Sequence, residues 1–284
     1  MVFRAGRTSE HMALSLFVGI MVFFAQSFIC TEQNITNAIF LRALTAFFSV
    51  LRLGLPAVIF AYMQNKAGFE ECKIERKTEC SVKYNIALAF LGFVSVFILG
   101  ILYSAAFPAS AASFRDESIA DAVLTVISSA FIPALFEECL YRKLICRDLL
   151  THGRAFAVII SALLFALAHF SFGVFPYAVV CGIILGFVYI KTGSARYTAA
   201  IHFANNFLAY VLSAFGKGMD KMDYFNMIVL IVIALCVISV GAVYAVLPNK
   251  KKFAFCECGN VSSSAFLTFP MTVYIFCSVL MNFI

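Results

Sequence analysis

Long apolar stretches recur along most of the chain, separated by short segments that carry most of the charged residues. An α-helix needs about 20 mostly apolar residues to cross the hydrocarbon core of a bilayer. Nine stretches approach or exceed this length, at residues 12–30, 43–63, 84–107, 122–143, 155–170, 176–191, 197–216, 225–247 and 265–284. The pattern predicts an all-α fold, a polytopic transmembrane helix bundle with eight or nine spans.

The composition strengthens this prediction. Hydrophobic residues make up 63% of the chain, charged residues 13%, and the mean hydropathy is +0.96. In soluble domains the apolar share is about 45–50%. We therefore expect an integral, multi-pass protein of a lipid bilayer, in a bacterial cell membrane or in the endoplasmic reticulum of a eukaryote.

The formal net charge of +6 indicates topology and gives no sign of nucleic-acid binding. Cytoplasmic loops of membrane proteins carry an excess of Lys and Arg. With the N-terminus in the cytoplasm, 16 of these residues fall in inner segments and four in outer ones, Arg42, Arg115, Lys217 and Lys221. The first stretch lacks an Ala-x-Ala cleavage site, so we expect a retained helix and no cleaved signal peptide.

Ionisable residues inside apolar stretches are the candidates for function, because they are costly in a membrane. Of fifteen Asp and Glu residues, only Glu137 and Glu138 are embedded in such a stretch. Of four histidines, His169 and His202 lie in apolar sequence. The ten cysteines suggest no disulfide framework, and Cys256-Glu-Cys258 supplies too few ligands for a four-ligand zinc site.

Helix geometry separates the two glutamates. Residues four apart share a helix face, whereas neighbours point about 100° apart. Glu138 can therefore pair with Arg142, while Glu137 is left to face a cavity. We assign Glu138 and Arg142 a structural role and Glu137 the chemical one, with the reversed assignment as the alternative.

Each histidine also has a partner four residues away, Phe165 for His169 and Asn206 for His202. A lone histidine in an apolar helix is more often a packed core residue than a catalytic one. The positions of these two add weight to the catalytic interpretation.

The depth of the candidates agrees across three stretches. Residues 137 and 169 each lie 16 positions from Gly153, the glycine of a predicted turn, so both would lie about 24 Å from it in an antiparallel hairpin. Glu137 is six residues from Lys143 and His202 is six from Arg196, which places both about 9 Å below the basic boundary. We expect one polar layer near the cytoplasmic side.

This set of residues suits the transfer of an acyl group to water. Glu137 is a candidate general base, and His169 is a candidate to share the water or to protonate the leaving amine. His202 and the Asn206 amide would donate hydrogen bonds to the oxyanion.

Two other mechanisms are alternatives for these residues. Cys139 is the one thiol beside the glutamates and is a weak candidate nucleophile. Glu137, His169 and His202 are also the ligand types of many zinc hydrolases, although His-Glu-x-x-His is absent. We favour a site without a cofactor and keep a divalent metal such as zinc as the alternative.

The three ordered motifs resemble those of the type II CAAX prenyl protease and bacteriocin-processing (CPBP, or abortive-infection) membrane proteases. They are Glu137-Glu138-x-x-x-Arg142, Phe165-x-x-x-His169 and His202-x-x-x-Asn206, and the likeness covers about residues 120–210. The resemblance implies an intramembrane endopeptidase in which the first glutamate and the second-motif histidine activate water. The third motif would supply the oxyanion hole, and Phe165 a supporting contact.

The resemblance also suggests how the chain divides. Residues 1–83 would hold N-terminal transmembrane helices and a charged cytoplasmic loop, 84–216 the catalytic core, and 217–284 C-terminal transmembrane helices. The expected partners are the bilayer and a membrane-associated peptide or protein, prenylated or not.

Two other classes of function and one residue are left open. The chain could act as a non-catalytic immunity protein or membrane scaffold, or as a proton-coupled transporter, although no internal repeat supports the latter. Arg52 lies within an apolar stretch and has no assigned role. It would snorkel to the interface, pair with a buried carboxylate or mark a broken helix.

Overall fold

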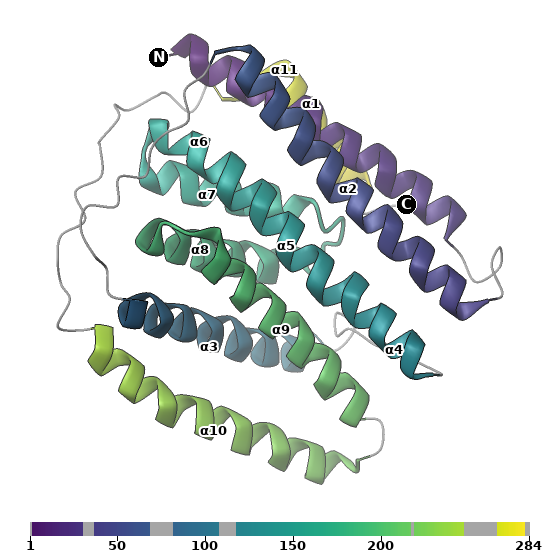
Figure 1. Cartoon of the computed structure of the whole chain (residues 1–284), viewed down its shortest axis with the longest axis vertical. Coiled ribbons are helices and arrows are strands. Elements are labelled where there is room, and N and C mark those ends of the chain that lie inside the picture. Colours follow the sequence, from purple (N-terminus) through teal and green to yellow (C-terminus); the bar gives the residue numbers. More distant parts are fainter. Residues whose placement is uncertain are drawn as a thin grey trace.

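The computed structural model describes residues 2–30, 37–68, 82–107, 118–216, 219–246 and 266–281, and every regular element within these ranges is a helix. Most of the charged insertion at 64–83, and the pair Cys256 and Cys258, lie outside the described residues. In Figure 1, α1, α2 and α11 lie along one side of the bundle, and α3 and α10 lie along the other. The helices from α4 to α9 lie between them.

Each of the nine predicted apolar stretches coincides with helix. The separate helices are α1 (Val2–Ile29), α2 (Ala38–Lys66), α3 (Val82–Ala106), α7 (Arg154–Leu167), α8 (Phe175–Thr192), α9 (Ala195–Gly216), α10 (Lys221–Val246) and α11 (Phe269–Leu280). The stretch predicted at 122–143 forms a continuous run of short helical elements. They are α4 (Ile119–Val126), η2 (Ile127–Phe131), α5 (Ile132–Glu138), η3 (Cys139–Cys146), α6 (Arg147–Leu149) and η4 (Leu150–His152).

Six of the described helical segments are long and apolar enough to cross a membrane. They are Gly6–Ile29, Ile39–Lys66, Val82–Ala106, Ile119–His152, Phe175–Thr192 and Lys221–Tyr244. Two shorter apolar helices are Arg154–Leu167 and Phe269–Leu280. Helix α9 is long enough but contains His202, Asn205 and Asn206, which lower its mean hydropathy. The predicted all-α membrane bundle is confirmed.

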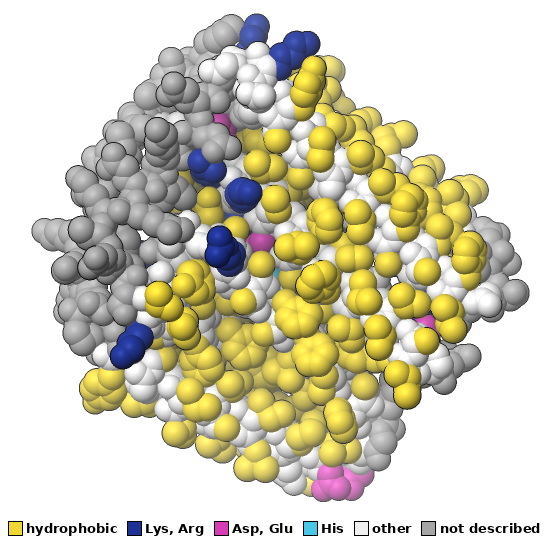
Figure 2. Space-filling model, in the orientation of Figure 1, with side chains coloured by type: hydrophobic (Ala, Val, Ile, Leu, Met, Phe, Trp, Pro, Cys, Tyr) yellow, Lys and Arg dark blue, Asp and Glu magenta, His cyan; other side chains and the backbone are white. Residues whose placement is uncertain are grey.

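The surface agrees with a bilayer environment. Figure 2 shows a broad face covered by hydrophobic side chains, with the Lys and Arg side chains of that face gathered toward one edge. Large apolar residues are exposed on several of the long helices, among them Val58 on α2 and Leu230 on α10. In water such a surface would be unfavourable, whereas acyl chains solvate it without cost.

The run from Ile119 to His152 is held to α2 near both of its ends. Arg42 Nε lies 3.2 Å from an Asp121 carboxylate oxygen, and Gln64 donates to Asp148 at 2.9 Å. Both aspartates are buried, so the sequence-based count of embedded acids was too low. Their hydropathy windows gave no sign of this, because the burial arises from packing against another helix.

The predicted turn at Gly153 is confirmed. Gly153 has a φ of +113°, which side chains with a Cβ rarely adopt, and it separates η4 from α7. Helix α7 then packs against η3 and α8. The turn therefore brings the second-motif helix alongside the first-motif helix, as the hairpin geometry required.

The α7–α8 packing depends on the small residue at position 182. A Cβ built on Gly182 would lie 2.9 Å from the Ala162 Cα, a distance at which the backbone must shift. A Cβ on Gly186 would lie 3.1 Å from Val158. The two glycines, spaced four residues apart, thus allow α7 and α8 to approach closely.

We expect Gly182→Ala to destabilise the protein by about 1–3 kcal/mol, because the added methyl group overpacks the α7–α8 contact. Thermal unfolding of the purified protein in detergent would measure this as a lower Tm. Gly241→Ala is the matched control, since a Cβ at Gly241 meets no atom within 4 Å. Equal Tm values for the two variants would contradict the packing argument.

Candidate functional site

The predicted catalytic residues line one cavity of about 1220 Å³. Glu137 comes from α5, His169 from the turn after α7, and His202 and Asn206 from α9. Helices α3, α8 and α10 supply further lining, much of it apolar. Residues separated by up to 69 positions in the chain thus share one cavity, as expected from the prediction that three apolar stretches bring their polar residues together.

Glu138 and Arg142 form a fully buried ion pair. Arg142 Nε lies 3.1 Å from Glu138 Oε2, and both residues are 0% exposed. Arg142 Nη1 also donates to the Ser161 hydroxyl on α7 at 3.3 Å. The pair predicted from the four-residue spacing is therefore present, and it links the first-motif helix to α7.

Phe165 lies at the centre of the polar groups. Its ring is 5.3 Å from the Arg142 guanidinium carbon, within the range of a cation–π interaction. The same ring meets the His169 and His202 rings edge to face, at centroid distances of 4.9 and 5.8 Å. Phe165 thus fixes the spacing between the ion pair and both histidines.

His202 bridges the two glutamates. Its Nδ1 lies 3.2 Å from Glu138 Oε1 and its Nε2 lies 4.0 Å from Glu137 Oε2. Because an ionised carboxylate only accepts hydrogen bonds, Nδ1 carries the hydrogen that Glu138 accepts. Nε2 can then donate only when His202 holds both protons.

The environment of Glu137 differs from that of Glu138. Glu137 lines the cavity and is 7% exposed, and its Oε2 is buried without a hydrogen-bond partner. Buried polar atoms in native proteins nearly always have a partner, so an orphan acceptor in a cavity marks a functional candidate. This geometry is consistent with a role of Glu137 in the chemistry and a structural role of Glu138.

His169 lies just beyond the helix on which it was expected. Helix α7 ends at Leu167, and His169 follows in a turn. Its Nδ1 is 2.9 Å from the Phe165 carbonyl oxygen, and a carbonyl can only accept, so Nδ1 donates. In the neutral ring Nε2 is then the unprotonated nitrogen, which can accept a hydrogen from water.

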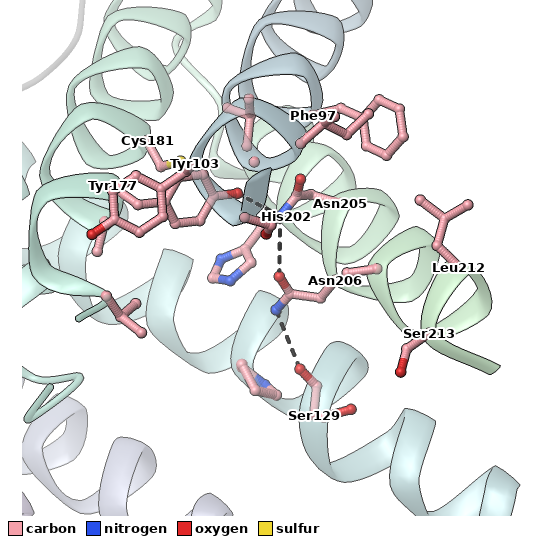
Figure 3. Close-up of a pocket in the computed structure, with 18 of the residues that line it drawn as sticks. Phe97, Tyr103, Ser129, Tyr177, Cys181, His202, Asn205, Asn206, Leu212 and Ser213 are labelled. Atoms are coloured by element: carbon pink, nitrogen blue, oxygen red, sulfur yellow. Dashed lines mark hydrogen bonds between the residues drawn. The ribbon is translucent and has the colours of Figure 1, made fainter. Parts of the chain in front are cut away.

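A chain of hydrogen bonds positions Asn206. Of its members, only Asn206 was predicted from the sequence as a site residue. Asn206 Nδ2 donates to the Ser129 carbonyl at 3.2 Å. Asn205 Nδ2 donates to Asn206 Oδ1 at 3.3 Å and to the Tyr177 hydroxyl at 3.2 Å. Figure 3 shows the chain running from Tyr177 through both asparagines to Ser129.

The sequence carried one usable sign of this chain. Asn205 is a second amide in an apolar stretch, directly beside a predicted site residue. Tyr177 and Ser129 carried no comparable sign, because their roles depend on contacts between helices.

The described residues contain no group of three His, Cys, Asp or Glu side chains placed to hold a metal ion. Glu137, His169 and His202, the ligands considered for zinc, therefore do not fit a three-ligand site in this arrangement. Cys139, the candidate nucleophile, is not among the residues that line the cavity.

The two glutamates should differ in their effect on stability. Glu138→Gln leaves Arg142 buried without its counter-charge and is expected to cost about 3–5 kcal/mol. Glu137→Gln removes only the 4.0 Å contact with His202 Nε2 and is expected to cost less than about 1 kcal/mol. Thermal unfolding of both variants in detergent tests this, and a larger loss for Glu137→Gln would reverse the structural assignment.

Comparison with known proteins gives a family match for the central part of the chain. Residues 119–208 match the family model described as Type II CAAX prenyl endopeptidase Rce1-like. No curated protein and no solved structure matches the chain significantly. The match covers the three motifs, so the resemblance to type II CAAX prenyl proteases that was inferred from them is confirmed over this segment.

Proposed function

We propose that the protein is an intramembrane endopeptidase that hydrolyses peptide bonds of membrane-associated proteins or peptides, with Glu137 as the general base. The main support is the buried Glu137 carboxylate oxygen that lacks a hydrogen-bond partner in a cavity shared with His169, His202 and Asn206. The family match over residues 119–208 supports the reaction class independently.

The reaction begins with a water molecule held between Glu137 and His169. Glu137 Oε2 and His169 Nε2 are both acceptors, so each can take one hydrogen bond from the same water. As the water oxygen attacks the scissile carbonyl carbon, its proton passes to the Glu137 carboxylate. The carbonyl π bond opens, and its electron pair moves to the oxygen.

The resulting oxyanion would be stabilised from α9. Asn206 has one amide hydrogen bonded to the Ser129 carbonyl, which leaves the other to point at the substrate. His202 would contribute Nε2–H in its doubly protonated form, held by the Glu138 carboxylate at Nδ1. Such fixed donors act strongly because they need no reorganisation during the reaction.

The last step breaks the peptide bond. The oxyanion electron pair re-forms the carbonyl as the C–N bond breaks, and the proton held by Glu137 passes to the leaving amine, directly or through His169 Nε2. The products are a carboxylic acid and an amine, between which the remaining proton is exchanged to give a carboxylate and an ammonium group, and one water molecule is consumed. Glu137 and His169 return to their starting states.

The cavity supports a substrate with an apolar portion. Beyond the polar groups it continues between α3, α9 and α10, where Val96, Phe97, Leu212, Phe225 and Ile228 are among the lining residues. Its volume of about 1220 Å³ exceeds what one peptide bond and its neighbours need. A lipidated peptide, including a prenylated one of the CAAX type, fits this shape and polarity.

Glu137→Gln and His169→Ala should each lower the cleavage rate by about 10²–10⁴-fold, because each removes a group that handles the proton in the transition state. The test compares membrane peptides from cells that produce the wild-type protein or either variant. Glu10→Gln is the matched control, since Glu10 is exposed on α1 and does not line the cavity.

The outcome separates enzyme from scaffold. Substrate peptides that accumulate only with the two site variants support the peptidase. A cleavage pattern that is unchanged in Glu137→Gln would exclude Glu137 as the base. Full biological activity of that same variant would instead point to a non-catalytic membrane protein.

Cleavage is expected to persist after treatment with a zinc chelator such as 1,10-phenanthroline, because no step of the proposed mechanism passes through a metal. The measurement is the initial rate on a membrane peptide identified in the preceding comparison, with and without the chelator. A loss of activity that added zinc restores would replace this mechanism with a metal-dependent one.

A further inference from the structure

Arg52 is a charged residue of the cavity wall that the mechanism does not use. It comes from α2, outside the segment that matches the family model, and it lines the same cavity as Glu137 and His169. Its guanidinium carbon lies 5.5 Å from the centre of the Phe23 ring on α1. This stacking holds the side chain in place without neutralising its charge.

The three roles considered from the sequence do not account for Arg52. Helix α2 continues through it from Ala38 to Lys66, so it does not mark a break. Its Nε is buried without a hydrogen-bond partner, so the head group does not snorkel fully into water. Among the described residues, no carboxylate lies within 4.0 Å of its guanidinium.

Both glutamates of the site have basic neighbours other than Arg52. Glu138 is paired with Arg142, and His202 lies beside both glutamates. Arg52 thus adds a positive charge that has no carboxylate within 4.0 Å in the described part of the chain. Such a group is costly inside a membrane protein and is expected to serve a bound anion.

We infer that Arg52 binds a carboxylate of the substrate peptide and thereby sets which peptide bond reaches Glu137. This inference rests on the proposed peptidase function. A guanidinium offers two parallel N–H groups that match the two oxygens of a carboxylate. The carboxylate belongs either to the C-terminus of the substrate or to an acidic side chain.

The two sources have different consequences. A C-terminal carboxylate held at Arg52 would fix the number of residues between the cleaved bond and the end of the substrate. An acidic side chain would instead select an internal sequence. In both cases Arg52 acts in recognition, separately from the proton transfers at Glu137.

The test measures binding to full-length protein that carries Glu137→Gln, so that cleavage does not interfere. The probes are three fluorescent, S-farnesylated peptides of one sequence. The first has a free C-terminal carboxylate, the second a C-terminal amide, and the third an amide after a terminal glutamate. Affinities are measured in detergent with Arg52 intact and with Arg52→Gln added.

With Arg52 intact, the free-acid peptide should bind about 10–100-fold more tightly than the amide, as expected for a charge-assisted hydrogen bond. Arg52→Gln should remove this preference and leave binding of the amide nearly unchanged. Equally tight binding of the glutamate peptide would assign the carboxylate to a side chain. Weak binding of that peptide would assign it to the C-terminus.

Lys191→Gln is the matched control. Lys191 is also a cation stacked on an aromatic ring, 5.4 Å from the centre of Phe187, but it does not line the cavity. This variant should keep the full preference for the free acid. Arg52→Lys keeps the charge and should keep part of the preference, and its Tm provides the folding control.

Three results would overturn the inference: equal affinity for all three peptides with Arg52 intact, an equal loss for all three in Arg52→Gln, or no measurable binding of either carboxylate peptide. An equal loss of affinity for all three peptides would mean that Arg52 acts through the overall electrostatic potential or the packing of the site. Because the readout is binding, these results are distinct from failure of the proposed peptidase function, which appears as unchanged cleavage in Glu137→Gln.

Discussion

The buried ion pair between Glu138 and Arg142 is the constraint on which the rest of the site depends. Neither residue is exposed, so the desolvation of both charges must be offset by contacts inside the bundle. Ser161 and Phe165 on α7 meet the arginine, and His202 on α9 meets the glutamate. The pair therefore joins three helices, and through Phe165 and His202 it also sets where both histidines lie.

The same constraint explains how two adjacent glutamates come to have different environments. Consecutive residues of a helix point about 100° apart, so the face that holds Glu138 against Arg142 necessarily turns Glu137 toward another part of the bundle. There the carboxylate meets the cavity and keeps an oxygen without a partner. The π-helical segment η3 begins directly after Glu138, and such segments are frequent at functional sites.

Hydropathy and spacing predicted the helices, the turn at Gly153 and the convergence of the three motifs, because these depend on periodicities within single segments. They could not predict contacts that only packing creates. His169 lies past the end of α7, and the Tyr177–Asn205 hydrogen bond joins α9 to α8, a helix that carries none of the three motifs. The sequence also could not predict that Arg52 lines the cavity, since this depends on how α2 is rotated about its axis.

The chemistry of the site also shapes the bundle around it. Helix α9 carries His202, Asn205 and Asn206 in its middle, and exposing these groups to acyl chains would leave them without hydrogen-bond partners. It can therefore be stable only between other helices, and it packs against α3, α5 and α8. Once α9 is enclosed, its polar side chains must face one another or a cavity. The polar residues of α9 thus dictate that this helix lies inside the bundle, among the more apolar helices around it.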